Sequence, residues 1–195
     1  MQKKFAEIIS FILNPLIVLV PVPFFLVLEK TSNLMLAFQW TGISIFFIFV
    51  FFILILFGIK FGIFSDLDIS KREQRPVLFS VGMALAISYL IFLLIFHAPV
   101  ILLVGTFSII LGVIVLGIVN MFTKASGHLA VLSAFVTFLV LVEGWQFLPA
   151  FLLLPVLAWA RIKTKNHTLL QTVLGAMIGS LTTIAIYVIV KYIVK

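Results

Sequence analysis

Long apolar runs separated by short polar segments form the main pattern of this chain. A run of about 20 apolar residues is long enough for a helix to cross a bilayer, and a helix satisfies its own backbone hydrogen bonds there. Strands of a membrane barrel would instead alternate apolar and polar residues, and the chain shows no such alternation. The pattern predicts an all-α fold, a polytopic transmembrane bundle of about six to seven helices, with residues 1–195 in a single domain.

Seven segments of this pattern are expected to be helical. Pro15, Pro21 and Pro23 lie in the first segment and should kink it or end it early, because proline lacks the amide hydrogen that an inner helical turn needs. The fifth and sixth segments are the shortest. The predicted helices are 5–28, 36–64, 77–96, 100–122, 128–142, 147–160 and 167 to the C-terminus.

The polar residues between these segments gather in three clusters. With seven crossings, all three clusters lie on the N-terminal side of the bilayer, whereas the turns at 29–35, 97–99 and 143–146 lie on the other side. Clusters that share a side could contribute to one site. The clusters are Ser65–Pro76, Thr123–His128 and Arg161–His167.

Composition supports the membrane assignment. The chain is 64% hydrophobic and 10% charged, whereas soluble domains are about half apolar and about a quarter charged. The absence of cysteine excludes disulfides and thiolate metal sites. The net charge of +7 suits loops beside anionic membrane lipids and does not indicate nucleic acid. Most of the 13 Lys and Arg residues fall on the cluster side, so the positive-inside rule places that side in the cytoplasm.

Two histidines in the clusters are candidates for chemistry. His128 follows Ser126 and Gly127 where a helix should begin, and the free amides of a helix N-terminus suit a phosphate. His167 opens the last helix and shares a face with Gln171. Arginines grip phosphate oxygens by paired donors, one histidine could attack phosphorus, and the other could protonate the leaving oxygen.

A metal site is not expected from the remaining candidate ligands. His97 falls in a turn on the other side of the bilayer, and Asp66 and Asp68 lie among basic residues. The sequence therefore predicts anion chemistry without a metal or another cofactor.

The order and spacing of these residues resemble the type 2 phosphatidic acid phosphatase superfamily, the membrane lipid phosphatases related to vanadium haloperoxidases. That family carries Lys, six residues and Arg-Pro; then Pro-Ser-Gly-His; then Ser-Arg, five residues, His, three residues and Asp. Arg75-Pro76 matches the end of the first motif, and Ser126-Gly127-His128 matches the second. Arg161 stands five residues before His167, as in the third. The resemblance implies a helical core like that of the haloperoxidases.

Roles for individual residues follow from this resemblance. His167 would be the nucleophile that forms a phosphohistidine, and His128 would be the general acid. Arg75 and Arg161 would hold the phosphate oxygens, with help from Ser126 and the Gly127 amide.

The chain departs from the family pattern at three positions: Asp68 replaces the first Lys, Ala125 replaces Pro, and Gln171 replaces the final Asp. Gln171 can accept a hydrogen bond from the nucleophilic imidazole but adds no charge. Lys71, Arg72 or Lys124 could supply the cation that Asp68 cannot, and Asp68 could instead orient an arginine. A divergent prokaryotic branch of the superfamily shows similar departures.

The expected function is therefore that of a multi-pass phosphatase in a prokaryotic cell membrane. It would hydrolyse a lipid phosphate or diphosphate, either polyprenyl or phosphatidate-like. Two alternatives stay open at this point, a lipid phosphotransferase and a non-catalytic binder or transporter of phosphorylated lipid.

Overall fold

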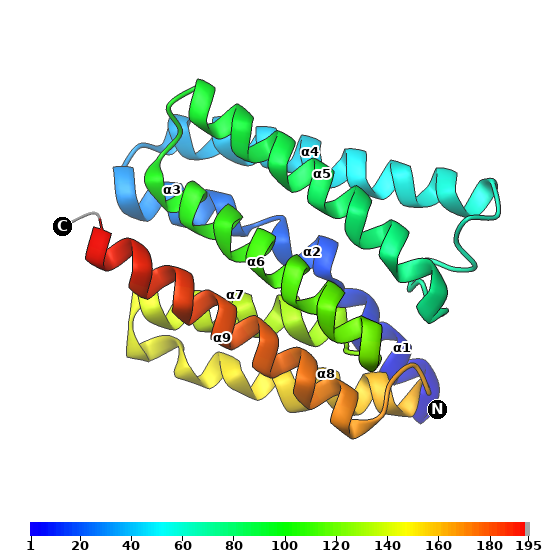
Figure 1. Ribbon diagram of the computed structural model, residues 1–195. Coiled ribbons are helices and arrows are strands. Elements are labelled where there is room, and N and C mark those ends of the chain that lie inside the picture. The colour runs from blue at the N-terminus through cyan, green and yellow to red at the C-terminus, as the bar shows by residue number, and fades with distance from the viewer. Residues whose placement is uncertain (194–195) are drawn as a thin grey trace. The chain divides into compact units, whose positions relative to one another are not determined.

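The computed structural model describes residues 1–193, and every regular element in them is a helix (Figure 1). Contacts group the chain into two compact units. One comprises Met1–Val18 and the chain from Met121 onward, and the other comprises Leu19–Asn120. The all-helical prediction is confirmed, whereas the single domain over 1–195 and the haloperoxidase-like core stay predictions.

The unit Leu19–Asn120 is built from long antiparallel helices. α3 packs against α4, and α4 packs along α5 (Figure 1). The elements are α3 (Val22–Thr31), α4 (Leu34–Lys60), the short 3-10 helix η1 (Arg72–Gln74), α5 (Arg75–Ile95) and α6 (Val100–Phe122). Its main core consists of Val27, Ala37, Trp40, Leu93, Ala98 and Leu102.

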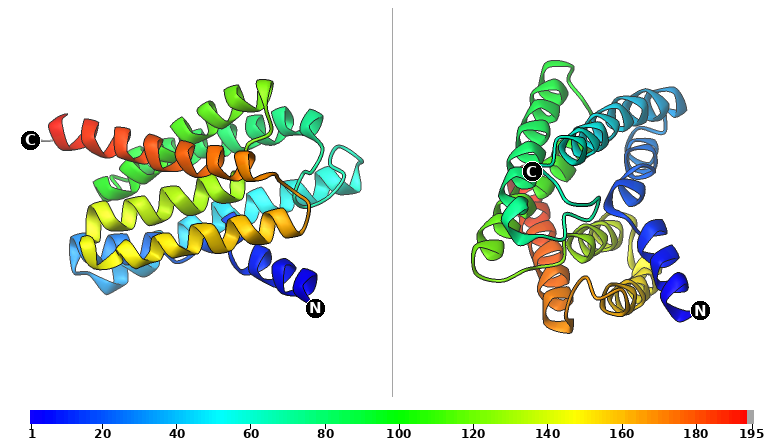
Figure 2. Two further views of the ribbon diagram at one scale, coloured as in Figure 1. Left: turned by 90° about the horizontal axis from the view of Figure 1, so that it is seen from below. Right: turned by 90° about the vertical axis from the view of Figure 1, so that its right-hand side faces the viewer.

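The other unit contains the N-terminal and C-terminal helices. Its elements are α1 (Gln2–Ile12), α2 (Pro15–Leu19), α7 (Gly127–Glu143), the 3-10 helix η2 (Trp145–Leu152), α8 (Leu153–Lys163) and α9 (Leu169–Ile193). α7 and α9 lie side by side along most of their length (Figure 2). Two glycines of α9 allow this approach, because a Cβ atom at Gly175 or Gly179 would overlap the carbonyl oxygen of Ser126 or Ala130.

Within the described residues, five helices are long and apolar enough to cross a membrane, and the chain is accordingly a multi-pass membrane protein. The number becomes six if Gln2–Leu19 and Val22–Thr31 count as one broken span. α7 is apolar but shorter, with 17 residues. The other spans are Leu34–Lys60, Arg72–Ile95, Val100–Phe122, Trp145–Lys163 and Leu169–Tyr192.

Within the described residues the predicted segments are helical, although residues 147–152 belong to the 3-10 helix η2. The predicted end of the last helix, at residues 194–195, lies outside the described residues. Two further differences are instructive. The first segment is divided into α1, α2 and α3, and these breaks fall at Asn14-Pro15 and at Pro21. α4 ends at Lys60 and not at Phe64, because Gly62 adopts a left-handed conformation with φ of 75°. The amides of Ile63 and Phe64 then turn back to the Gly58 carbonyl, at 2.8 and 3.0 Å.

Candidate functional site

The first turn of α9 is closed by a reciprocal pair of hydrogen bonds between Thr168 and Gln171. The Gln171 backbone amide donates to Thr168 Oγ1 at 3.4 Å, and the Thr168 backbone amide donates to the side-chain oxygen Gln171 Oε1 at 3.2 Å. This arrangement is a capping box, in which a Thr at the helix start and a Gln three residues later satisfy two otherwise unpaired amides. A glutamine therefore suits the position where the resemblance expects Asp.

The same glutamine oxygen determines the proton position on His167. Gln171 Oε1 lies 3.1 Å from His167 Nδ1. Because this atom also accepts from the Thr168 amide, it must be the oxygen of the carboxamide. His167 Nδ1 must then donate, so the neutral ring carries its lone pair on Nε2. His167 is only 7% exposed, and the bond to Gln171 fixes the orientation of its ring.

The start of α7 meets the start of α9. The Ser126 amide donates to the Gln171 carbonyl at 3.0 Å, and Ser126 Oγ accepts from the Leu129 amide at 3.5 Å. His128 lies in the first turn of α7, and a Cβ atom at Gly127 would meet nothing within 4 Å beyond its chain neighbours. Two helix N-termini therefore converge here, and their positive ends favour an anion.

Two cations of the second and third clusters lie at the same end of this unit. Arg161 is 3% exposed in the last turn of α8, and its carbonyl accepts from the His167 amide at 3.3 Å. Lys124 Nζ donates to the Asn166 carbonyl at 2.8 Å, which ties the two clusters together. The structure thus brings together the chain segments that carry Lys124, Ser126, Gly127, His128, Arg161, His167 and Gln171.

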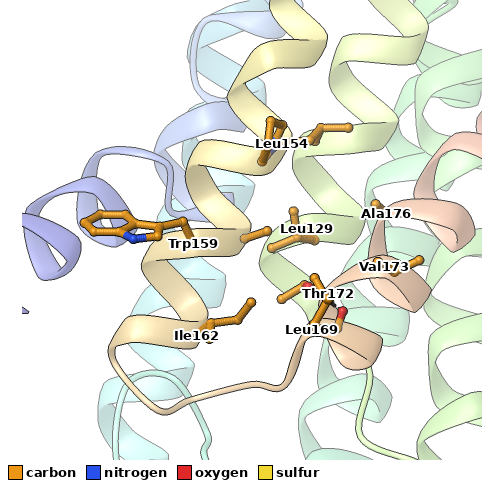
Figure 3. Close-up of a pocket in the computed structure, with 10 residues that line it drawn as sticks. Leu129, Leu154, Trp159, Ile162, Leu169, Thr172, Val173 and Ala176 are labelled. Carbon is orange, nitrogen blue, oxygen red and sulfur yellow. Dashed lines mark hydrogen bonds between the residues drawn. The ribbon is translucent and has the colours of Figure 1, made fainter.

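An apolar groove of about 420 Å³ lies between α8 and α9, with α7 behind it (Figure 3). It begins beside the polar residues, because its lining includes their chain neighbours Leu129, Ile162 and Thr172. Leu154, Trp159 and Ala176 continue the lining along the helices. A groove with almost no polar lining, within apolar helices, suits a hydrocarbon chain.

The first cluster belongs to the other unit, where Arg75 and Arg72 converge on Asn120. Arg75 Nη1 donates to Asn120 Oδ1 at 2.8 Å, and Arg72 Nε donates to the Asn120 carbonyl at 2.7 Å. Arg75 is 6% exposed, and its Nε also contacts the Ile69 carbonyl at 3.4 Å. The role of both arginines in phosphate binding stays a prediction.

The loop before these arginines is organised by Asp66. Its carboxylate accepts from Ser65 Oγ at 2.7 Å and from Ser70 Oγ at 3.0 Å. Partial burial raises the pKa of the Asp66 carboxyl, but the hydrogen bonds from Ser65 and Ser70 outweigh it, so this pKa lies below its ordinary value. Asp66 is therefore ionised near neutral pH, and the orienting role expected of Asp68 stays a prediction.

Two asparagines make contacts that the sequence did not predict. Asn14 Nδ2 lies 3.5 Å from His128 Nε2, and Asn120 binds both arginines of the first cluster. Asn120 was detectable in principle, because a polar amide within an apolar helix is costly unless it has partners. Asn14 gave no comparable signal, since it resembles an ordinary residue before proline.

Within residues 1–193, no group of three or more histidine and acidic side chains is placed to hold a metal ion. No protein-family profile, curated protein or solved structure matches the chain. The resemblance carried by the motifs therefore stays a prediction from the sequence.

Proposed function

We propose that this protein is a membrane lipid phosphatase that works through a phosphohistidine intermediate on His167 and needs no metal. The observation that carries the proposal is the shared oxygen of Gln171. It accepts from Thr168 and from His167 Nδ1, which leaves the Nε2 lone pair of His167 as the nucleophile. Two helix N-termini meet in the chain next to this residue, the Arg161 carbonyl accepts from the His167 backbone amide, and Lys124 Nζ donates to the Asn166 carbonyl. Helix N-termini and cations of this kind suit a phosphate.

The proposed reaction has two steps, formation and hydrolysis of the phosphohistidine. In the first, His167 Nε2 forms a bond to phosphorus, the bond from phosphorus to the lipid oxygen breaks, and His128 gives that oxygen a proton. In the second, water attacks phosphorus, the phosphorus–nitrogen bond breaks, and its electron pair returns to Nε2. The proton of the water passes to His128. The products are inorganic phosphate and a lipid alcohol, or a lipid monophosphate where the substrate is a diphosphate.

The groove favours a lipid over a soluble phosphate ester. Its lining includes Leu129 and Thr172, the chain neighbours of His128 and Gln171, and it runs between helices that are apolar enough to lie in a bilayer. A phosphate at the polar end would therefore leave its hydrocarbon chain in the groove.

Phosphate release in the presence of a chelator tests the proposal. Purified protein should release phosphate from lipid phosphates or diphosphates. His167→Gln should reduce the rate to background, and His128→Gln should reduce it by about 10²- to 10⁴-fold. His97→Gln is the matched control, because His97 is exposed in the turn between α5 and α6, and this variant should keep the wild-type rate.

Three results would contradict the proposal in different ways. Wild-type rates in both site variants would remove the histidines from the mechanism. Tight binding of lipid phosphate without turnover would favour a non-catalytic binder or transporter. Transfer of the phosphate to an added alcohol in preference to water would favour a phosphotransferase.

A further inference from the structure

The N-terminal helix α1 has an exposed apolar face. Phe5 and Phe11 are 59% and 70% exposed, and Ile8 between them is 54% exposed. The helix packs on α8, and its buried residues are Ala6 and Ser10. Side chains three residues apart lie on one face of a helix. The exposed residues therefore form an apolar stripe, which suits the boundary between headgroups and hydrocarbon in a bilayer.

Four exposed lysines lie at one end of the unit that contains α1. One pair opens α1, and the other pair lies at the end of α8 and in the turn that follows it. The two helices meet where the ring centroids of Phe5 and Trp159 are 6.2 Å apart. Figures 1 and 2 show the start of α1 beside the C-terminal end of α8. The four residues, named the lysine rim, are Lys3, Lys4, Lys163 and Lys165.

The acidic residues of the same unit offset little of this charge. The sequence of the unit has two of them, Glu7 and Glu143. Glu143 ends α7, at the opposite end of that helix from Gly127 and His128. Glu7 is therefore the one acidic residue of this unit near the lysines. Lysines beside an apolar helix face extend to the headgroup level, where they attract anionic lipids.

Trp159 connects the lysine rim with the apolar groove. It lines the groove, and Figure 3 shows its ring on the side of α8 that faces α1. Trp159 is 40% exposed, and tryptophan favours the headgroup level of a bilayer. Lys163 follows four residues later, on the same face of the helix. A lipid on the lysine rim would thus lie next to Trp159.

We propose that the lysine rim and the apolar stripe of α1 together bind anionic lipids of the bilayer. The headgroup phosphates contact the lysines, and the acyl chains lie along the stripe. Anionic membrane lipid fits both features, because one molecule then supplies the negative charge and the apolar surface. This inference goes beyond the proposed function, since it requires neither histidine and no hydrolysis.

Quenching of Trp159 fluorescence by brominated lipids tests this surface in the full chain. The protein is placed in phosphatidylcholine vesicles that contain a small fraction of brominated phosphatidylglycerol or of brominated phosphatidylcholine. The Trp159 signal is the difference between the wild type and Trp159→Phe. The anionic lipid should bind beside Trp159 at least about five-fold more tightly, a factor that one lysine near an anionic surface can supply. The preference should vanish in about 1 M salt, which screens these charges.

Variants without charge locate the preference. The double variants Lys3→Gln/Lys4→Gln and Lys163→Gln/Lys165→Gln should each lower it at least about two-fold, and replacement of all four lysines should abolish it. Lys191→Gln is the matched control, because Lys191 is exposed in the last turn of α9, at the other end of the unit. This variant should keep the full preference.

Several results would overturn the inference. They are equal quenching by the two lipids in the wild type, a preference that survives about 1 M salt or the loss of all four lysines, and an equal loss in Lys191→Gln. His167→Gln should keep the preference, and its loss there would place the lipid at the proposed catalytic site instead. The salt series needs no lysine variant, so it decides the matter even where a variant fails to fold. A wild type that releases no phosphate would contradict the proposed function and leave this result unchanged.

Discussion

Gln171 makes two hydrogen bonds through one side-chain oxygen, and each has a separate purpose. One closes the first turn of α9, and the other orients His167. Gln171→Glu keeps both acceptors and adds a negative charge beside the ring. That charge should stabilise the positive imidazole formed during phosphoryl transfer, so kcat should be maintained or rise by about several-fold. Gln171→Met has a similar length but no acceptor, and should lower kcat by about 10- to 100-fold.

Thr168→Ala separates the two purposes of Gln171. It removes Oγ1 from the cap but leaves the Thr168 amide and the bond from His167 to Gln171. This variant should lose about 0.5–2 kcal/mol of unfolding free energy, as expected for a lost cap, with most of its kcat retained. Equal activity of wild type and Gln171→Met would show that the glutamine does not orient the nucleophile.

Among the secondary-structure elements, the close contact between α7 and α9 positions the site. A methyl group at Gly175 would overlap the carbonyl oxygen of Ser126, the residue whose amide binds Gln171. Gly175→Ala should therefore push the two helix starts apart. The expected cost is about 1–3 kcal/mol of unfolding free energy, together with a clear loss of kcat. Denaturation and phosphate release measure the two effects.

Gly105→Ala is the control for this prediction. Gly105 also lies inside a helix, but a Cβ atom there meets nothing within 4 Å. Alanine at this position should be neutral or stabilising by up to about 1 kcal/mol. A Gly175→Ala variant as stable and active as Gly105→Ala would contradict the role given to the close approach.

The boundaries of elements could be predicted where local chemistry decides them. α6 runs from Val100 to Phe122 as expected, because a polar turn bounds the apolar run at each end. α4 could not be placed as well, since its end depends on Phe64 folding back over Gly58. The bond between Asn14 and His128 was also beyond prediction, because it depends on packing between segments remote in sequence.

At the scale of the whole molecule, the site should draw its substrate from the bilayer. Ala176→Phe places a ring in the groove and should raise KM for a long-chain lipid phosphate by about 10-fold. Activity on a short-chain, water-soluble ester should change little. Ala185→Phe on the same helix is the control, because Ala185 is exposed and does not line the groove. Equal losses on both substrates in Ala176→Phe would argue against a chain in the groove.

The motifs predicted His128, Arg161 and His167 as one group, and the described structure places their backbones at one end of the same unit. This part was predictable because a helix start and a short turn are local features. The way in which Gln171 takes the place of the expected Asp could not be predicted. It depends on the hydrogen bond from the Thr168 backbone amide as well as on the one from His167.

Capture of the intermediate tests the central claim most directly. Protein mixed with a lipid phosphate that carries a radiolabelled phosphoryl group is quenched rapidly in alkali, and the labelled peptide is identified by mass spectrometry. We predict a label that is stable to alkali, lost in acid and located on His167, and no label in His167→Gln. Phosphate release without a labelled protein, or a label on another residue, would contradict the mechanism.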